Sequence, residues 1–378
     1  MRIFFFIIFI ISLSSIKPDD IDLSTYYKTY IKEFGFDLEV HDVETEDGYI
    51  LSLWHLVPQG PTDRVALFFH GLADTSWGFF QMEDKSLPFL LSKEGFDVWL
   101  ANVRGNVFSD RHKVINSSDE TSFYDYSIDE HVKYDLPSII SYIKSKTGGK
   151  KMSYIAHSQG STIFFMAYMH NPELIESSFD HFTSVGTVPN IAHTDFTPVK
   201  ILDVIYKFFD KIEFDKGIVL SDSQRKFISK VCKIAPAPCK YIFEKESTIT
   251  PTDRTNYDKL YNLLYYYPGG MSKNNLLHWS QIHKEKKLVY FNPNFEDEQT
   301  SVPYDTNILA KWKIKALVAR TDDDCLSSYD DVTDLYNLIE DKSYIELLDL
   351  KSYGHLDVLD AESAYEDIFI PMINFLKS

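Results

Sequence analysis

Residues 151–169, KMSYIAHSQGSTIFFMAYM, place Ser158 between two apolar runs. A serine hydroxyl is a weak nucleophile, and it reacts only where a sharp turn exposes it to a neighbouring base. Such a turn brings the flanking backbones close together, so the residues two before and two after the serine must be small. Ala156 and Gly160 meet that demand. The pattern therefore predicts Ser158 as a catalytic nucleophile.

The segments on either side of Ser158 supply the strand–turn–helix context that this pattern needs. Residues 152–156 form a short apolar run typical of a strand. Residues 163–169 are apolar on every side, as expected of a helix buried beneath a central sheet. The alternative interpretation is a serine that only caps the following helix. The flanking runs favour the nucleophile.

Two backbone N–H groups are expected to stabilise the oxyanion that an attacking serine creates. One should come from the residue after the nucleophile, which is Gln159. The other should come from the loop after an earlier strand. The run FFHGLADTSWGFF offers Leu72 as that donor, directly after His70 and Gly71. His70 stands at the end of the strand, where we expect it to shape the turn and not to act as a base.

The base should be a histidine that follows the last strand and precedes the C-terminal helix, because the order Ser, Asp, His is usual in sheets of this kind. Of the twelve histidines, only His355, in LKSYGHLDVLD, has that position. His157 adjoins the serine, but adjacent residues on such a turn point apart. His278 and His283 lie in or near a separate helical region, and we interpret them as structural.

The acid of the triad should follow the preceding strand. The run ARTDDDCLSSYDDV offers Asp322, Asp323 and Asp324 in succession. The residue types alone do not choose among the three. The alternative for each of them is a solvated or helix-capping carboxylate.

The elements that must position these residues are short strands that alternate with helices. Residues 36–45 and 49–58 alternate with period two around Asp47-Gly48, which predicts a β-hairpin. Five apolar runs suit strands covered on both faces, and helical spacing follows several of them. The runs are 65–70, 97–102, 151–157, 314–320 and 344–350, and the helical stretches are 127–145, 329–340 and 361–376. This alternation predicts an α/β fold with an open, mostly parallel sheet and helices on both faces.

One region breaks the alternation. Residues 190–286 contain no fully apolar run but many aromatic and charged residues at helical spacing. A stretch of that length is too long for a connecting loop. We therefore predict a mainly helical cap inserted into a core formed by residues 16–189 and 287–378.

Composition and the N-terminus limit the class of protein. The chain has 378 residues, a formal net charge of −18 and no basic cluster, so nucleic acid is not an expected partner. Arg2 precedes an apolar run that is too short to span a bilayer and is followed by small residues. This pattern predicts a cleaved signal peptide over residues 1–15, the alternative being an uncleaved signal anchor.

Entry into the secretory pathway changes how the cysteines and one asparagine are interpreted. Cys232 and Cys239 are close in sequence and could close a small disulfide loop in an oxidising compartment. Asn116 begins an N-glycosylation sequon in a polar stretch. Both features agree with a secreted or lysosomal protein.

The chain resembles the acid lipase family of α/β-hydrolases, the family of gastric and lysosomal acid lipases. The matching segments are FFHGL, DVWLANVRGNVFSDRH, FYDYSIDEHVKYDLP, YIAHSQGS, YYPGGMSKNNLLHWSQ, DCLSSYDDV and YGHLDVL, in the family's order. The resemblance implies an α/β-hydrolase fold, with residues 190–286 as cap and lid. It implies Ser158 as nucleophile, Leu72 and Gln159 at the oxyanion hole, and His355 as base.

The resemblance also selects among the acids and marks three departures. The family's D-x-L string implies Asp324 as the triad acid, whereas Asp357, in the H-L-D string after the base, is not. Ala156 replaces a glycine of the family, and Cys325 stands where a large aromatic residue is common. The third departure is the cap, which is only loosely similar, although Cys232 and Cys239 resemble the family's short cap disulfide.

The expected function is a secreted or lysosomal lipase that hydrolyses lipid esters at a lipid–water interface through an acyl-enzyme. No metal or cofactor is expected, since the chain has no H-E-x-x-H motif or zinc-spaced Cys/His cluster, and no stable protein partner is implied. A mobile cap would expose apolar surface to lipid, whereas an immobile one would shape an esterase pocket. The alternatives are a short-chain esterase or acyltransferase, or a non-catalytic lipid carrier or adhesion module.

Overall fold

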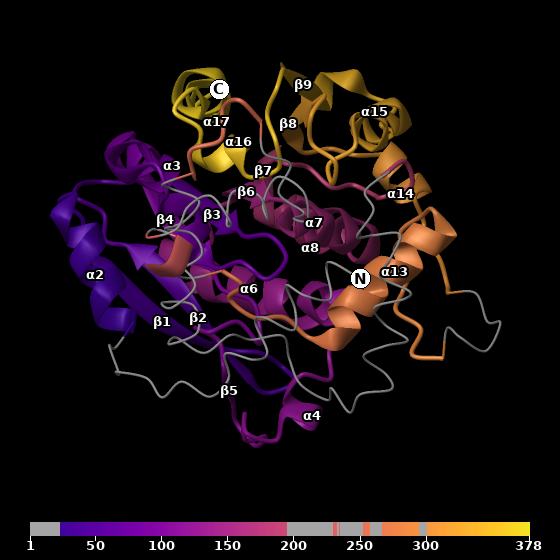
Figure 1. The fold of residues 1–378 in the computed structure, drawn as a ribbon, viewed down its shortest axis with the longest axis horizontal. Helices are drawn as coiled ribbons and strands as arrows, with labels where there is room; N and C mark the ends of the chain where they lie inside the picture. Colours follow the sequence, from indigo (N-terminus) through magenta and orange to yellow (C-terminus); the bar gives the residue numbers. More distant parts are fainter. Residues whose placement is uncertain (1–22, 195–229, 233, 235–251, 258–266, 295–300) are drawn as a thin grey trace.

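The computed structural model describes residues 23–194, 230–232, 234, 252–257, 267–294 and 301–378. Its centre is a nine-stranded sheet in the order β1-β2-β4-β3-β6-β7-β8-β9, with β5 beside β2 (Figure 1). The strands are β1 Leu38–Glu44, β2 Tyr49–Leu56, β3 Arg64–Phe69, β4 Phe96–Ala101, β5 Arg111–His112, β6 Met152–His157, β7 Phe179–Val185, β8 Lys315–Thr321 and β9 Ile345–Leu350.

The sheet is antiparallel at one edge and parallel elsewhere. Strand β2 pairs antiparallel with β1, β4 and β5, whereas every pair from β4 through β9 along the sheet is parallel. The hairpin of β1 and β2 turns at Gly48, whose φ of +99° favours glycine. The predicted hairpin and the mostly parallel sheet are confirmed.

Helices cover both faces of the sheet and bury two apolar clusters against it. Helices α2, α3, α16 and α17 contribute to one cluster, and α6, α7, α8, α13, α14 and α15 contribute to the other. The helices are α2 Leu23–Glu33, α3 Leu87–Lys93, α4 Glu120–Phe123, α5 Ile128–Glu130, α6 Leu136–Thr147, α7 Gln159–His170, α8 Pro172–Ser178, α13 Lys273–Glu285, α14 Asn307–Ala310, α15 Tyr329–Leu338, α16 Asp357–Asp360 and α17 Ile370–Leu376. The C-terminal α17 lies near α3 in Figure 1, and Lys377 bonds Glu94 there.

Two of the predicted helical stretches contain a π turn that ends two residues before a proline. Residues His131–Asp135 precede α6, which has Pro137 in its first turn, and Tyr365–Phe369 precede α17, which has Pro371. A proline lacks the N–H that an α-helix requires in its interior. The wider turn before each proline therefore lets the helical path continue through both predicted stretches.

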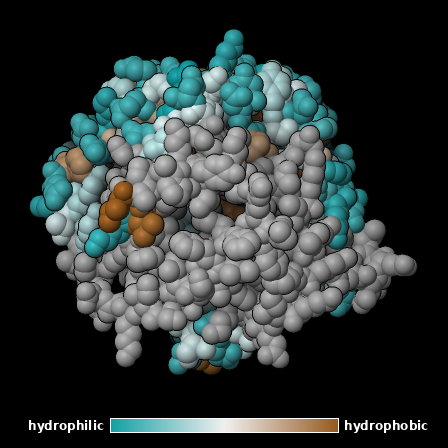
Figure 2. All heavy atoms as spheres, in the orientation of Figure 1, coloured by the Kyte–Doolittle hydropathy of each residue, from teal (hydrophilic) through white to brown (hydrophobic). Residues whose placement is uncertain are grey.

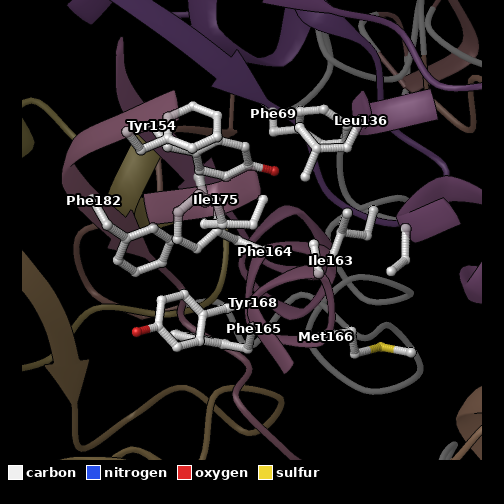
Figure 3. Packing of buried hydrophobic residues seen from close by; sticks show 14 of the residues in the cluster. Phe69, Leu136, Tyr154, Ile163, Phe164, Phe165, Met166, Tyr168, Ile175 and Phe182 are labelled. Atoms are coloured by element: carbon white, nitrogen blue, oxygen red, sulfur yellow. The ribbon is translucent and has the colours of Figure 1, made fainter. Parts of the chain in front are cut away.

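Helix α7 is buried at the centre of the larger cluster. Its residues 159–169 are all buried, which includes the apolar run 163–169 that was predicted to be so. The ring of Phe164 lies 4.4 Å from that of Tyr154 on β6 and 4.7 Å from that of Phe182 on β7, measured between centroids (Figure 3). This packing fixes the helix that begins directly after Ser158.

The sequence prediction lacks strand β7, which pairs with β6 and β8 at the middle of the sheet. Its sequence, FDHFTSV, contains Asp180, His181, Thr183 and Ser184 and so is not an apolar run. Thr183 and Ser184 are nevertheless buried. The strand forms because both neighbouring strands supply its backbone partners, which is a tertiary effect.

Residues 1–22, with the predicted signal peptide, and most of the predicted cap lie outside the described residues. Within the predicted cap, the structure describes α13 over Lys273–Glu285. The predicted boundaries of the core, 16–189 and 287–378, and of the cap, 190–286, stay predictions.

The described residues around the edge of the face shown in Figure 2 are mainly hydrophilic. Of the helices that the structure describes, none has the length and apolar character needed to cross a bilayer.

Candidate active site

Ser158 occupies the sharp turn between β6 and α7. Its φ of 52° and ψ of −125° place a non-glycine residue in a sparsely populated region of backbone conformation. A Cβ added at Gly160 would lie 2.2 Å from the carbonyl oxygen of Phe69, so this position requires glycine. The Ser158 side chain makes no helix-capping hydrogen bond, contrary to the alternative interpretation of this serine.

The structure brings Ser158, His355 and Asp324 together at the carboxyl ends of parallel strands. The Oγ of Ser158 lies 2.8 Å from Nε2 of His355, and Nδ1 of His355 lies 2.7 Å from Oδ2 of Asp324. These three residues follow β6, β9 and β8 respectively, and all are buried. Nδ1–H of His355 can donate to the carboxylate while Nε2 accepts from the hydroxyl, as a general base requires.

Asp324 is also held by backbone. Its Oδ1 accepts hydrogen bonds of 2.9 Å from the N–H groups of Leu326 and Ser327. Burial alone would raise the pKa of this carboxyl, but His355 and the backbone donors outweigh it and lower the pKa below its usual value. Asp322 and Asp323 are exposed, and Oδ1 of Asp322 accepts a 3.0 Å hydrogen bond from the N–H of Ser352.

His157 holds the backbone of His355, the predicted base, by a hydrogen bond. Its Nε2–H donates to the carbonyl oxygen of His355 over 3.0 Å. Burial, and then the nearby His355, lower the pKa of His157 to about 3, so its imidazole is neutral. The prediction that His157 is not the base agrees with this geometry, because its ring contacts the backbone of His355 and not Ser158.

The loop after β3 packs directly against the nucleophile. A Cβ added at Gly71 would lie 2.9 Å from Cβ of Ser158, so Leu72 follows the point of closest approach. His70 shapes this loop as predicted, since its Nδ1–H donates to the carbonyl of Gly71 over 2.8 Å. Its Nε2 accepts from the N–H of Val103 over 3.3 Å.

Gln159, the other predicted oxyanion donor, is buried at the start of α7. Its side-chain Oε1 accepts a 2.7 Å hydrogen bond from the indole Nε1–H of Trp279 on α13. The sequence prediction did not include this contact, because the two residues are 120 positions apart. The string LLHWSQ, quoted for the family resemblance, was the available signal.

Asp357, which the prediction excluded from the triad, holds the loop that carries His355. Its Oδ2 accepts from the N–H of Gly354 over 2.8 Å and from Oγ1 of Thr252 over 2.6 Å. Its Oδ1 accepts from Oγ1 of Thr255 over 2.6 Å. The carboxylate thus joins residues of the predicted cap to the histidine loop.

Comparison with known proteins decides the family. The family model described as "alpha/beta hydrolase fold" matches residues 65–361, and the one described as "partial alpha/beta-hydrolase lipase region" matches residues 27–83. Human lipase member K is 30% identical, covering 92% of this chain and 90% of its own. Mouse gastric triacylglycerol lipase is 29% identical with the same coverage. This chain belongs to the acid lipase family of α/β-hydrolases. The predicted family and fold are confirmed, and the chain is a carboxylic ester hydrolase of the lipase class.

Solved structures agree with the fold of this acid lipase. The carboxylesterase CesB of Bacillus subtilis has a TM-score of 0.55 at 10% identity, covering 93% of this chain and 96% of its own. A putative lipase of Acinetobacter baumannii has the same TM-score at 12% identity, covering 96% and 98%. At such identities the likeness concerns the fold alone.

The remaining predicted residues of this acid lipase lie outside the triad. Asn116 is exposed, and its Oδ1 accepts from the N–H of Ser118. Cys232 is buried, whereas Cys239 lies outside the described residues, so their disulfide stays a prediction. His278 and His283 contact backbone carbonyls, in agreement with the structural role predicted for them.

Proposed function

We propose that this acid lipase hydrolyses carboxylic esters of lipids, with Ser158 as nucleophile, His355 as base and Asp324 as the orienting acid. The observation that carries the proposal is the 2.8 Å contact between Ser158 Oγ and His355 Nε2, with the other nitrogen of the ring on buried Asp324. A nucleophile, its base and an orienting third group are what covalent ester hydrolysis requires.

In the first half of the reaction, Ser158 Oγ attacks the ester carbonyl carbon while Nε2 of His355 takes the hydroxyl proton. The Asp324 carboxylate stabilises the resulting imidazolium and keeps Nδ1 protonated. Collapse of the tetrahedral intermediate transfers the proton from Nε2 to the leaving alcohol. The product is an acyl ester on Ser158.

In the second half, a water molecule attacks the acyl carbonyl carbon. His355 takes a proton from that water and returns it to Ser158 Oγ, which releases the fatty acid. The backbone N–H groups of Leu72 and Gln159 would bind the oxyanion in both halves, each worth about 3 kcal/mol of barrier by the usual cost of losing one donor. The close approach of Gly71 to Ser158 supports this assignment.

Lipid esters are the proposed substrate class because relatives that align over 92% of this chain include proteins named gastric triacylglycerol lipase. We further propose entry into the secretory pathway, with an extracellular or lysosomal destination, a Cys232–Cys239 disulfide and glycosylation at Asn116. The apolar N-terminal run and the exposed position of Asn116 support this part. We also propose that a cap within residues 190–286 opens at a lipid–water interface.

The test is a hydrolysis panel on the secreted protein, comparing a soluble butyrate ester, emulsified triolein and cholesteryl oleate at about pH 5 and about pH 7.5. Ser158→Ala should abolish turnover of every substrate, and Ser145→Ala, on the exposed side of α6, is the matched control. Strong turnover of the long-chain emulsions supports a lipase. Turnover of the butyrate ester alone would make the protein a short-chain esterase, and unchanged turnover in Ser158→Ala would overturn the mechanism.

A further inference from the structure

Glu39, His41 and His55 lie on one face of the β1–β2 hairpin, at the edge of the sheet. Glu39 is directly opposite His55 in the register of the two strands. His41 is two residues beyond Glu39, so its side chain projects on the same face. These three residues, here called the hairpin cluster, are not part of the triad, which follows β6, β8 and β9.

The spacing of the three side chains suits a metal ion. Oε2 of Glu39 lies 3.3 Å from Nε2 of His41 and 3.6 Å from Nδ1 of His55, and the three ligand atoms all lie within 4.8 Å of one another. Zinc–ligand distances of ~2.0–2.2 Å correspond to ligand–ligand separations of ~3.3–3.6 Å in a tetrahedron. The two distances from Oε2 of Glu39 to the histidine nitrogens therefore already match those of a tetrahedral zinc site.

The second nitrogen of each imidazole has its own partner. Nε2 of His55 lies 2.6 Å from Oδ1 of Asp97, and Nδ1 of His41 lies 3.1 Å from the hydroxyl of Tyr142. A carboxylate on the far nitrogen of a histidine fixes the tautomer that leaves the near nitrogen as a lone-pair donor. Nε2 of His41 is buried, and it faces Oε2 of Glu39 over 3.3 Å.

We propose that the hairpin cluster binds one divalent transition metal ion, with Zn²⁺ as the best match. Two imidazoles and one carboxylate suit Zn²⁺ and do not suit Mg²⁺ or Ca²⁺, which prefer oxygen ligands alone. The Glu39 side chain is 57% exposed, so water can complete the coordination. The positive charge of Lys146 lies close enough to interact with His41, but the negative charges of Glu39 and Asp97 outnumber it, so the site favours a cation. The bound ion would fasten the edge strand β1 to β2.

The test uses the full-length protein, freed of metal by a chelator and titrated with Zn²⁺ by calorimetry. Wild type should bind one Zn²⁺ through this site. His41→Gln and His55→Gln should each weaken that binding at least about 100-fold, and Asp97→Asn about 10–100-fold through the histidine that it orients. His170→Gln and Glu44→Gln, at exposed positions outside the cluster, are the controls and should bind as wild type does.

A spectroscopic readout locates the ion independently. The ring of Trp99 stacks on His55 with a centroid distance of 3.8 Å. Titration with Co²⁺ should therefore quench the tryptophan fluorescence of wild type, and the quenching should be smaller in Trp99→Phe, which lacks the ring stacked on His55. Zinc binding that is unchanged in His41→Gln and His55→Gln, or Co²⁺ quenching that is equal in wild type and Trp99→Phe, would overturn the proposal. So would the absence of any binding by wild type.

Discussion

At the scale of the residue, the candidate site depends on a few groups that are each held by a second contact. The strained backbone of Ser158 exposes its hydroxyl to His355, and the carbonyl of His355 is in turn bonded by His157. Asp324 orients the ring of His355 and is itself fixed by two backbone N–H groups. Each group therefore has little freedom to leave the geometry that proton transfer requires.

The role of Asp324 is tested by Asp324→Asn. An asparagine amide would donate to Nδ1 of His355, so the ring would carry its proton on Nε2 and could not accept one from Ser158. We expect kcat for an ester substrate to fall by about 10⁴-fold, as in other triads. Asp322→Asn is the control, because Asp322 is exposed, and its activity should be unchanged. Equal losses in the two variants would contradict the assignment.

The residue types alone predicted only part of this site. Ser158 stands in a local pattern and His355 after the last strand, so both could be found by position. The choice of Asp324 over Asp322 needed the family resemblance, because residue types alone do not reveal that Asp324 is buried and Asp322 exposed. Trp279 could not be assigned, since its contact with Gln159 depends on how α13 packs on the sheet.

At the scale of the element, strands with apolar runs were predictable and the central strand β7 was not. Hydrophobic periodicity reports apolar side chains, but β7 has the polar residues Thr183 and Ser184 at buried positions and pairs through its backbone with both neighbouring strands. The π turns were also missed, since a helical pattern does not reveal how the backbone accommodates Pro137 and Pro371. The sequence predicted that these helices exist, but it did not predict the backbone hydrogen bonds of their π turns.

A hydrogen bond from Trp279 on α13 to Gln159 connects that helix to the nucleophile turn, and Trp279→Phe would remove it. The substitution leaves Oε1 of Gln159 buried without that donor, at a cost of about 1–3 kcal/mol. Because the backbone N–H of Gln159 is the proposed oxyanion donor, its misplacement should lower kcat about 10-fold with little change in KM. Steady-state kinetics on an emulsified ester would measure this.

The matched control for Trp279→Phe is Trp312→Phe. Trp312 is buried, and its indole N–H donates to the carbonyl of Ile314, so the same kind of bond is lost away from the triad. Both variants should have a lower melting temperature, whereas only Trp279→Phe should lose kcat. If kcat falls equally in both, Trp279 acts through general stability and does not position Gln159.

At the scale of the whole molecule, buried ionisable groups set how the stability of the fold depends on pH. Burial lowers the pKa of His70 to about 4 and that of His157 to about 3. In the unfolded chain both histidines have the usual pKa of ~6.5, so below that pH the unfolded chain binds protons that the folded chain does not. Their contribution to stability is therefore fully present above pH ~6.5 and is lost as the pH falls toward the lower pKa values of the folded state. Burial raises the pKa of Asp74 to about 7, which has the opposite effect.

Asp74 follows the loop that carries Leu72, and its carboxyl is buried. Between pH ~4 and pH 7 the unfolded chain has lost the Asp74 proton while the folded chain retains it, so this residue lowers the stability of the fold as the pH rises. From pH 5 to pH 7.5 the loss is about 2–3 kcal/mol.

The substitution Asp74→Asn tests this, because an asparagine cannot ionise. The free energy of unfolding of Asp74→Asn minus that of wild type should be about 2–3 kcal/mol larger at pH 7.5 than at pH 5. That is a relative shift in melting temperature of about 3–4 °C for a chain of this length. Thermal melts of both proteins at the two pH values measure it, with exposed Asp84→Asn as the control. A difference that is the same at both pH values would show that Asp74 ionises as readily in the fold as in the unfolded chain.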